Sequence, residues 1–290
     1  MHTEFSKRSL LFGNMLKRIS HRHKMKKDKI SILKDIFCNI EQFDDNKSGY
    51  SIAKRAIKEL FENTSNKSFN HIYSRLIIID SLYSTQMGRR YYGLEELAET
   101  LLQLNNQYET RDLFIKLALN PNIDNLSKLN CSDHLNLFER KYGIQKDGEK
   151  KGRAISLISK YAYFETGFNF PIYDSIIKEV FPIICTSCRF PEISSTKTSD
   201  NIINYLSNIN TLKSKLSELL EIEISYDKLD MVLWHIGKVK REHLSLVLSM
   251  SDYMIFATDN DGNNKIEKIY ETNCYKENVA MRLILDYLSI

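Results

Sequence analysis

Glycine, proline and tryptophan are scarce in this sequence, which has ten, four and one of them among its 290 residues. The tight turns of sandwiches and barrels depend heavily on glycine and proline, so their shortage argues against those architectures. The frequent Leu, Ile, Lys and Glu residues favour helices instead. With 42% hydrophobic residues, the chain is long enough to bury one large core or two modest ones. We therefore expect a folded, mainly α protein.

Cysteines are few and dispersed, and no pattern of disulfides or metal ligands emerges from them. The Cys185 and Cys188 pair has metal-ligand spacing, but no second pair or histidine cluster accompanies it. Residues Phe5 to Phe12 lack the features of a secretory signal, and no apolar run reaches transmembrane length. We expect reduced thiols, a cytoplasmic protein that does not enter a membrane, and no metal or cofactor.

Positive charge is concentrated near the N-terminus, although the net charge is only +4. Nine Lys, Arg or His residues fall between Lys17 and Lys29, and Asp28 is the one acid among them. Residues 1–30 are therefore interpreted as a basic arm. Such an arm is either solvated without a partner or in contact with nucleic-acid phosphates, and the sequence leaves both alternatives open.

Apolar residues three and four apart predict a helical core over residues 31–238. The expected helices are Ile30–Phe43, Ser51–Phe61, Phe69–Tyr83, Leu94–Leu104, Thr110–Leu119, Ser132–Tyr142, Arg153–Phe164, Ile176–Ile184, Ser199–Glu221 and Tyr226–Lys238. Residues 239–290 are expected to form a small α/β extension. It would hold a β-hairpin over Tyr253–Tyr270 and a final helix over Glu277–Leu288.

The stretch from Gly148 to Lys178 combines a basic turn, an amphipathic helix and a single acid. Lys150, Lys151 and Arg153 stand at the start of the helix, where a helix N-terminus favours anions. After the loop, Asp174 precedes the next apolar-periodic segment and is placed to cap its helix. This order of parts resembles that of the helix-hairpin-helix DNA glycosylases, the superfamily of 8-oxoguanine glycosylases and endonuclease III.

A second stretch supports the resemblance. Leu76–Gln86, LIIIDSLYSTQ, is similar to the early core helix of that superfamily and the Ser-x-Gln type segment that follows it. The resemblance covers residues 69–238. It implies a multi-helix glycosylase core that binds duplex DNA and flips one nucleotide out of it, without a cofactor. Asp174 would then stabilise positive charge at the sugar, and in a lyase Lys151 would be the nucleophilic amine.

The resemblance also assigns the residues around the acid. Gln86, Tyr173, Ser156 and Trp234 would form the base pocket. Lys150, Arg153, Arg89 and Arg90 would bind phosphates. Without the resemblance, residues 84–92 are better explained as a surface loop with packed tyrosines, and Trp234 as a core residue.

Two departures from the family pattern keep a second function open. The glycine-rich hairpin is replaced by scattered Gly143, Gly148 and Gly152, and no lysine falls at the expected place between Ala154 and Ser156. The first hypothesis is a DNA N-glycosylase, with or without lyase activity, that acts in DNA repair. The alternative is a non-catalytic glycosylase-fold module that binds a nucleobase, a nucleic acid or an operon-encoded protein partner in a bacterial antiviral defence system.

Overall fold

The computed structural model describes residues 28–41, 49–63, 68–83, 85–130, 135–144, 148–149, 152–194, 201–253 and 279–289. Helices dominate these residues, and only isolated β-bridges occur among them. The mainly helical class expected from the shortage of glycine and proline is confirmed.

The first half of the described chain contains α2 (Lys29–Asn39), α3 (Gly49–Asn63), α4 (Phe69–Tyr83), the 3-10 helix η2 (Met87–Arg89), α5 (Gly93–Gln107), α6 (Thr110–Leu119) and α7 (Ile123–Ser127). The second half contains α8 (Ile155–Glu165), α9 (Ser175–Ser187), α10 (Pro191–Ser194), α11 (Ile202–Leu220), α12 (Tyr226–Tyr253) and α15 (Val279–Ser289).

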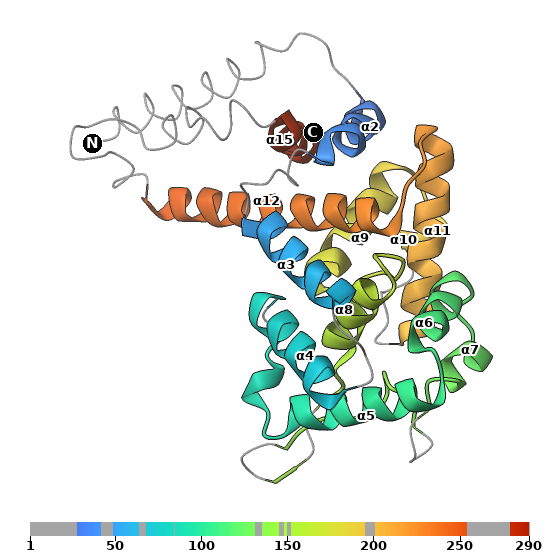
Figure 1. Cartoon of the computed structure of the whole chain (residues 1–290). Coiled ribbons are helices and arrows are strands. Elements are labelled where there is room, and N and C mark those ends of the chain that lie inside the picture. The colour runs from blue at the N-terminus through green and yellow to red at the C-terminus, as the bar shows by residue number, and fades with distance from the viewer. Residues whose placement is uncertain are drawn as a thin grey trace, which may run out of the picture.

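Helix α8 is the centre of the structure. Nine of its eleven residues are buried, and it packs against α3, α4 and α6. Figure 1 shows α8 and α9 between α4 and α5 on one side and the long α12 on the other. A short helix that is buried on nearly all sides has to be apolar nearly all round. Any charged residue that it carries must therefore find a partner inside the protein.

Helix α15 places the last described residues beside α2, the first described helix. It packs against α2 and α12, and its Ile284 and Tyr287 are part of the buried core. This final helix confirms the one expected at Glu277–Leu288. The hairpin expected over Tyr253–Tyr270 lies almost wholly outside the described residues.

The helix expected over Ser132–Tyr142 is wrong. Residues 135–144 form turns and isolated bridges instead. The side-chain oxygen of Asn136 accepts hydrogen bonds from the backbone N–H groups of Phe138 (3.1 Å) and Glu139 (3.0 Å). An asparagine that bonds its own backbone in this way favours a turn over a helix. The described residues directly before α8, 135–144 and 148–149, thus contain no helix that could form a helix-hairpin-helix unit with α8.

The end expected for the helix at Lys238 is also wrong, because α12 continues to Tyr253. Gly237 does not interrupt it. Its missing side chain allows α9 to approach closely: a Cβ atom built at Gly237 would lie 2.2 Å from Ile176 Cγ2. The domain boundary expected near Val239 therefore falls inside a continuous helix.

Candidate functional site: a buried lysine and aspartate between α8 and α9

Asp174 caps α9, as its position in the sequence predicts. Its Oδ1 atom accepts a hydrogen bond from the backbone N–H of Ile176 at 2.7 Å, in the extended conformation usual for a capping residue. The side chain is 17% exposed. The N-terminal end of a helix carries partial positive charge, so it stabilises the ionised carboxylate there.

Lys160 of α8 is the partner of this acid. Its side chain is 2% exposed, and Nζ lies 3.0 Å from Asp174 Oδ2. Nζ also donates a hydrogen bond to Ser156 Oγ (2.9 Å), one helical turn earlier, and it lies 5.5 Å from the centre of the Tyr83 ring. The ion pair therefore joins α8, the start of α9 and the end of α4.

The segment that leads to Asp174 is held on both sides. The backbone N–H of Tyr173 donates to Ser159 Oγ of α8 at 2.9 Å. On the other side, the hydroxyl of Tyr205 of α11 donates to the carbonyl of Ile172. Phe170 and Ile172 are buried. These contacts fix the backbone on which the Asp174 carboxylate faces Lys160.

A second buried ion pair lies between α3 and α12. Lys54, 5% exposed, donates to both carboxylate oxygens of Asp227 at 2.8 and 3.0 Å. The hydroxyl of Tyr163 of α8 donates to the same carboxylate. The ammonium group lies 5.0 Å from the centre of the Phe168 ring. Helix α8 therefore contacts two lysine and aspartate pairs: Lys160 belongs to one, and Tyr163 bonds the acid of the other.

Asp230 is a third acid beside the two pairs. It is 7% exposed, and within the described part of the chain its buried Oδ1 has no hydrogen-bond partner. Burial is the main cause that raises the pKa of this carboxyl to about 8, and the negative charges of Asp174 and Asp227 raise it further. Lys160 and Lys54 act in the opposite direction.

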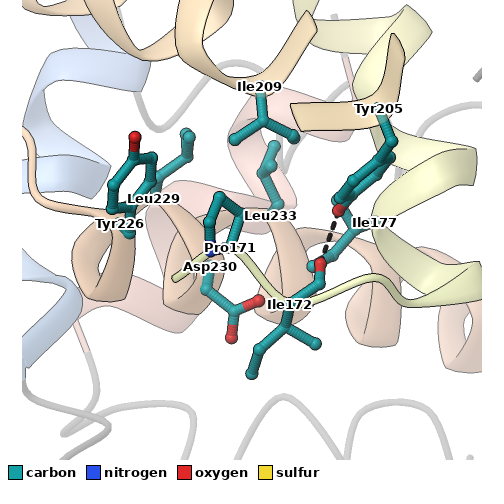
Figure 2. Close-up of a pocket in the computed structure, with 9 residues that line it drawn as sticks. All are labelled: Pro171, Ile172, Ile177, Tyr205, Ile209, Tyr226, Leu229, Asp230 and Leu233. Atoms are coloured by element: carbon teal, nitrogen blue, oxygen red, sulfur yellow. Dashed lines mark hydrogen bonds between the residues drawn. The ribbon is translucent and has the colours of Figure 1, made fainter. Parts of the chain in front are cut away.

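A small cavity adjoins Asp230 beneath the segment that precedes Asp174. Its volume is about 10 Å³, roughly the room that one water molecule needs. Figure 2 shows Asp230 beside Pro171 and Ile172, with the hydrogen bond from Tyr205 to the Ile172 carbonyl. Ile177, Ile209, Tyr226, Leu229 and Leu233 complete its wall. A nucleobase does not fit into this space without movement of the surrounding segments.

Trp234, a predicted base-pocket residue, and its neighbour His235 lie further along α12. Trp234 is half-buried, makes an edge contact with the ring of His235 (5.0 Å between centroids) and has Lys238 Nζ 5.4 Å from its ring centre. His235 is 7% exposed, and burial lowers its pKa to about 4. Trp234 does not line the small cavity.

Gln86, Arg89 and Arg90 belong to a surface loop between α4 and α5. Gln86 is exposed and adopts a left-handed backbone (φ 63°). Arg89 is exposed too. Arg90 instead donates from Nη1 to the carbonyl of Gly152 at 2.6 Å. It therefore fastens the loop to the segment before α8, with one nitrogen already engaged.

The same loop pairs with the segment before α8 through the backbone. Tyr91 and Ile144 exchange N–H to carbonyl bonds of 3.3 and 3.0 Å, and Lys141 pairs with Arg153. Arg153 is exposed beside this bridge. Two candidate phosphate-binding stretches that are far apart in the sequence are thus neighbours on the surface. Lys150 and Lys151, the predicted nucleophile, lie outside the described residues.

The predicted base-pocket residues Ser156 and Tyr173 lie next to the Lys160 and Asp174 pair. Ser156 accepts a hydrogen bond from Lys160, and the Tyr173 hydroxyl accepts one from Lys178 at 2.7 Å. Sequence reasoning missed Lys160 and Asp230. The sequence marks Lys160 only as the one basic residue within an apolar helix, four positions after a serine, and this does not identify its partner.

The described residues contain no group of three or more His, Cys, Asp or Glu side chains placed to hold a metal ion. Cys185 and Cys188 are buried thiols, and burial raises their pKa values to about 12 and about 11, which makes them poor nucleophiles and ligands. None of the described helices combines the length and the apolarity that crossing a bilayer requires.

Comparisons with known proteins return no match: no protein-family model, curated protein or solved structure matches this chain.

Proposed function

We propose that this chain is a DNA N-glycosylase of the lyase type, in which Lys160 is the nucleophilic amine and Asp174 the assisting carboxylate. The observation that carries the proposal is the 3.0 Å contact between Lys160 Nζ and Asp174 Oδ2, with Asp174 at the N-terminus of α9. A nucleophile and a base need to lie within hydrogen-bond reach for such chemistry. Lys160 here takes the role that the sequence assigned to Lys151.

The pair supplies both groups that the reaction needs. The Lys160 ammonium loses one proton to Asp174 Oδ2, and the freed amine attacks C1′ of the nucleotide. The bond from C1′ to the base nitrogen breaks, and its electron pair leaves with the base, which takes up the proton held by Asp174 Oδ2. One of the two remaining amine protons moves to O4′ as the bond from C1′ to O4′ breaks, and the nitrogen lone pair forms the C=N bond of a protonated imine to Lys160. Asp174, now ionised again, stabilises this positive charge at the sugar.

Substrate entry requires the site to open. Lys160 is 2% exposed, and the nearby cavity holds no more than a water molecule. The segment before Asp174 and the end of α4 at Tyr83 cover the amine. In this proposal they separate when the flipped nucleotide enters, and the exposed Arg89 and Arg153 hold the flanking phosphates.

A second candidate function is a non-catalytic binding module, and the closure of the site favours it. Both carboxylate oxygens of Asp174 are engaged, one by Ile176 N–H and the other by Lys160. In this interpretation the ion pair fastens α8 to α9, as Lys54 and Asp227 fasten α3 to α12. The module would then bind a nucleobase, nucleic acid or protein partner by its surface.

Borohydride trapping distinguishes the two. The protein is incubated with duplexes that carry modified bases, mismatches or abasic sites, and the reduced protein–DNA adduct is measured. We expect adducts with the wild type and none with Lys160→Met. Lys54→Met is the matched control: it removes another buried lysine amine that pairs with an aspartate, and this variant should still be trapped. Equal trapping by Lys160→Met, or no adduct from the wild type with any duplex, would favour the binding module.

A further inference from the structure

Asp230 carries an unmet hydrogen-bonding requirement. Its Oδ1 atom is buried and has no partner in the described structure, although the residue borders a water-sized cavity. Leaving a buried polar atom unpaired destabilises a folded protein. Neither ion pair needs this acid, because each lysine already has its own aspartate. The two ion pairs therefore do not explain why an acid with an unpaired oxygen is buried at position 230.

Charged groups on four helices act on the Asp230 carboxyl. They are Asp227 one turn earlier on α12, Asp174 at the start of α9, Lys160 on α8 and Lys54 on α3. Two titratable tyrosines, Tyr205 of α11 and Tyr226 of α12, line the same cavity as Asp230. Burial together with Asp230 raises the pKa of Tyr205 well above the usual value, and burial raises that of Tyr226.

The charges of these neighbours cancel without Asp230. Two ammonium groups balance two carboxylates, so an ionised Asp230 would leave one negative charge uncompensated in a desolvated region. Such a charge is costly, and the carboxyl keeps its proton instead. The pKa of about 8 agrees with this balance.

We propose that Asp230 is a positioning residue for the Lys160 and Asp174 pair. At neutral pH it stays uncharged beside the pair. In alkaline solution it becomes negative and then holds Lys160 in its ammonium form. While Asp230 is neutral, a proton can move from Lys160 Nζ to Asp174 Oδ2: the N–H bond breaks, the electron pair stays on nitrogen and an O–H bond forms. An additional negative charge next to the pair opposes this transfer, because it favours the ammonium group. The consequence for catalysis rests on the proposed function, whereas the effect on Lys160 does not.

The charge of Asp230 is measured directly in the unmodified protein. Carbonyl-labelled aspartate is incorporated, and the Asp230 Cγ signal is followed by NMR between pH 4 and pH 10, with the signal assigned by its loss in Asp230→Asn. We expect a single transition near pH 8. A transition below pH 5 would mean that the acid is charged at neutral pH, which would overturn the proposal without any need for a variant to fold.

The effect on Lys160 is measured in the variant. In protein labelled with ¹⁵N-lysine, the Lys160 Nζ signal, assigned by its loss in Lys160→Met, is titrated in the wild type and in Asp230→Asn. We expect the amine to lose its proton at a pH lower by about one unit in Asp230→Asn, because one negative charge near a cation shifts its titration by about that much. Asp124→Asn, which removes an exposed acid on α7, is the control and should titrate as the wild type does. Identical Lys160 curves for Asp230→Asn and the wild type would contradict the proposal.

Trapping gives a separate readout. If the wild type forms a borohydride adduct, Asp230→Asn should reach its half-maximal trapping rate at a pH that is lower by about one unit. Its maximal trapping rate should stay within a few-fold of the wild-type rate. Failure of the proposed function appears as no adduct from either protein, with the NMR shifts still present. Failure of the role of Asp230 appears as adduct formation with an unshifted pH profile.

Discussion

Gly237 of α12 and Ile176 of α9 are packed so closely that a Cβ atom at position 237 would lie 2.2 Å from Ile176 Cγ2. Ile176 is the residue whose N–H group Asp174 caps. The contact between the two helices therefore also sets the position of the catalytic carboxylate in the proposed reaction. A glycine inside a helix costs about 1 kcal/mol relative to alanine, and here close helix packing offsets that cost.

We expect Gly237→Ala to destabilise the protein, although alanine is the better helix former. The added methyl group forces α9 away from α12, and overpacking of this kind costs about 1–3 kcal/mol. Urea unfolding measures the loss. Gly152→Ala is the control, because no atom lies within 4 Å of a Cβ at that position. Equal stability of Gly237→Ala and the wild type would show that the helices are not in this close contact.

Asp230 and His235 predict a distinctive dependence of stability on pH. The folded chain holds a proton on Asp230 from its ordinary pKa of 3.8 up to about 8, so stability falls as pH rises through this range. Between about pH 4 and pH 6.5 the unfolded chain holds a proton on His235 and the folded chain does not, so this residue makes stability rise with pH there. Below pH 6.5 the two effects oppose each other, and between pH 6.5 and 8 only that of Asp230 remains.

We therefore expect Asp230→Asn to gain stability relative to the wild type between pH 6.5 and 8, by about 2 kcal/mol at about 1.4 kcal/mol per pH unit. Urea unfolding at pH 5, 6.5 and 8 gives the two curves, and the difference between them removes the contribution of all other groups. Parallel curves over this range would show that Asp230 keeps no proton in the folded state. Asp124→Asn should run parallel to the wild type throughout.

The sequence contains enough local information for most helices and for Asp174, but not for its partners. Helices α4 and α6 begin and end where apolar spacing predicts, and Asp174 is recognisable as a cap because it directly precedes an apolar periodic segment. Lys160 was not predicted, since its burial depends on the chain folding back through the loop so that Asp174 returns onto α8. A lysine on a helix is otherwise expected to point into solvent.

Long-range packing explains the other failures as well. Asp230 has the sequence context of an ordinary polar position on an amphipathic helix, and it is buried only because α9, α11 and the segment before Asp174 pack around it. Residues 135–144 have helical apolar spacing, yet the Asn136 side chain bonds the backbone of the following residues and produces a turn. The two stretches joined by Tyr91 and Ile144 are more than fifty residues apart, which no local pattern reports.

If the protein binds DNA as proposed, the loop around Arg89 and the segment around Arg153 should form one common surface for it, because backbone bridges hold them close together. Arg89 and Arg153 are both exposed on the two paired stretches, so charge reversal of both, Arg89→Glu with Arg153→Glu, should weaken binding to duplex DNA. The slope of log affinity against log salt should fall by about 0.9 for each phosphate that the variant no longer neutralises. Fluorescence anisotropy over a salt series measures both effects. Lys128→Glu, an exposed site after α7, is the control, and equal weakening of binding in that variant would indicate a non-specific charge effect.

Asp174→Asn tests the acid, and the structure makes the expected result specific. Asparagine keeps the cap on α9, because its side-chain oxygen accepts from Ile176 N–H as the aspartate does. It leaves the Lys160 ammonium without its counter-charge, however, and removal of one partner of a buried pair costs about 3 kcal/mol. We expect reduced stability and no base excision, with DNA affinity retained at a temperature where the variant is folded.

The double variant Lys160→Met with Asp174→Asn separates stability from chemistry. Replacement of both charges removes the unpaired ammonium, so we expect stability to return to within about 1 kcal/mol of the wild type. Excision and trapping should remain absent, because neither the amine nor the carboxylate is left. A parallel double variant, Lys54→Met with Asp227→Asn, removes the corresponding pair between α3 and α12 and should keep both activities. If excision persists when Lys160 and Asp174 are both replaced, the pair only fastens α8 to α9, and the reactive groups of the protein lie elsewhere.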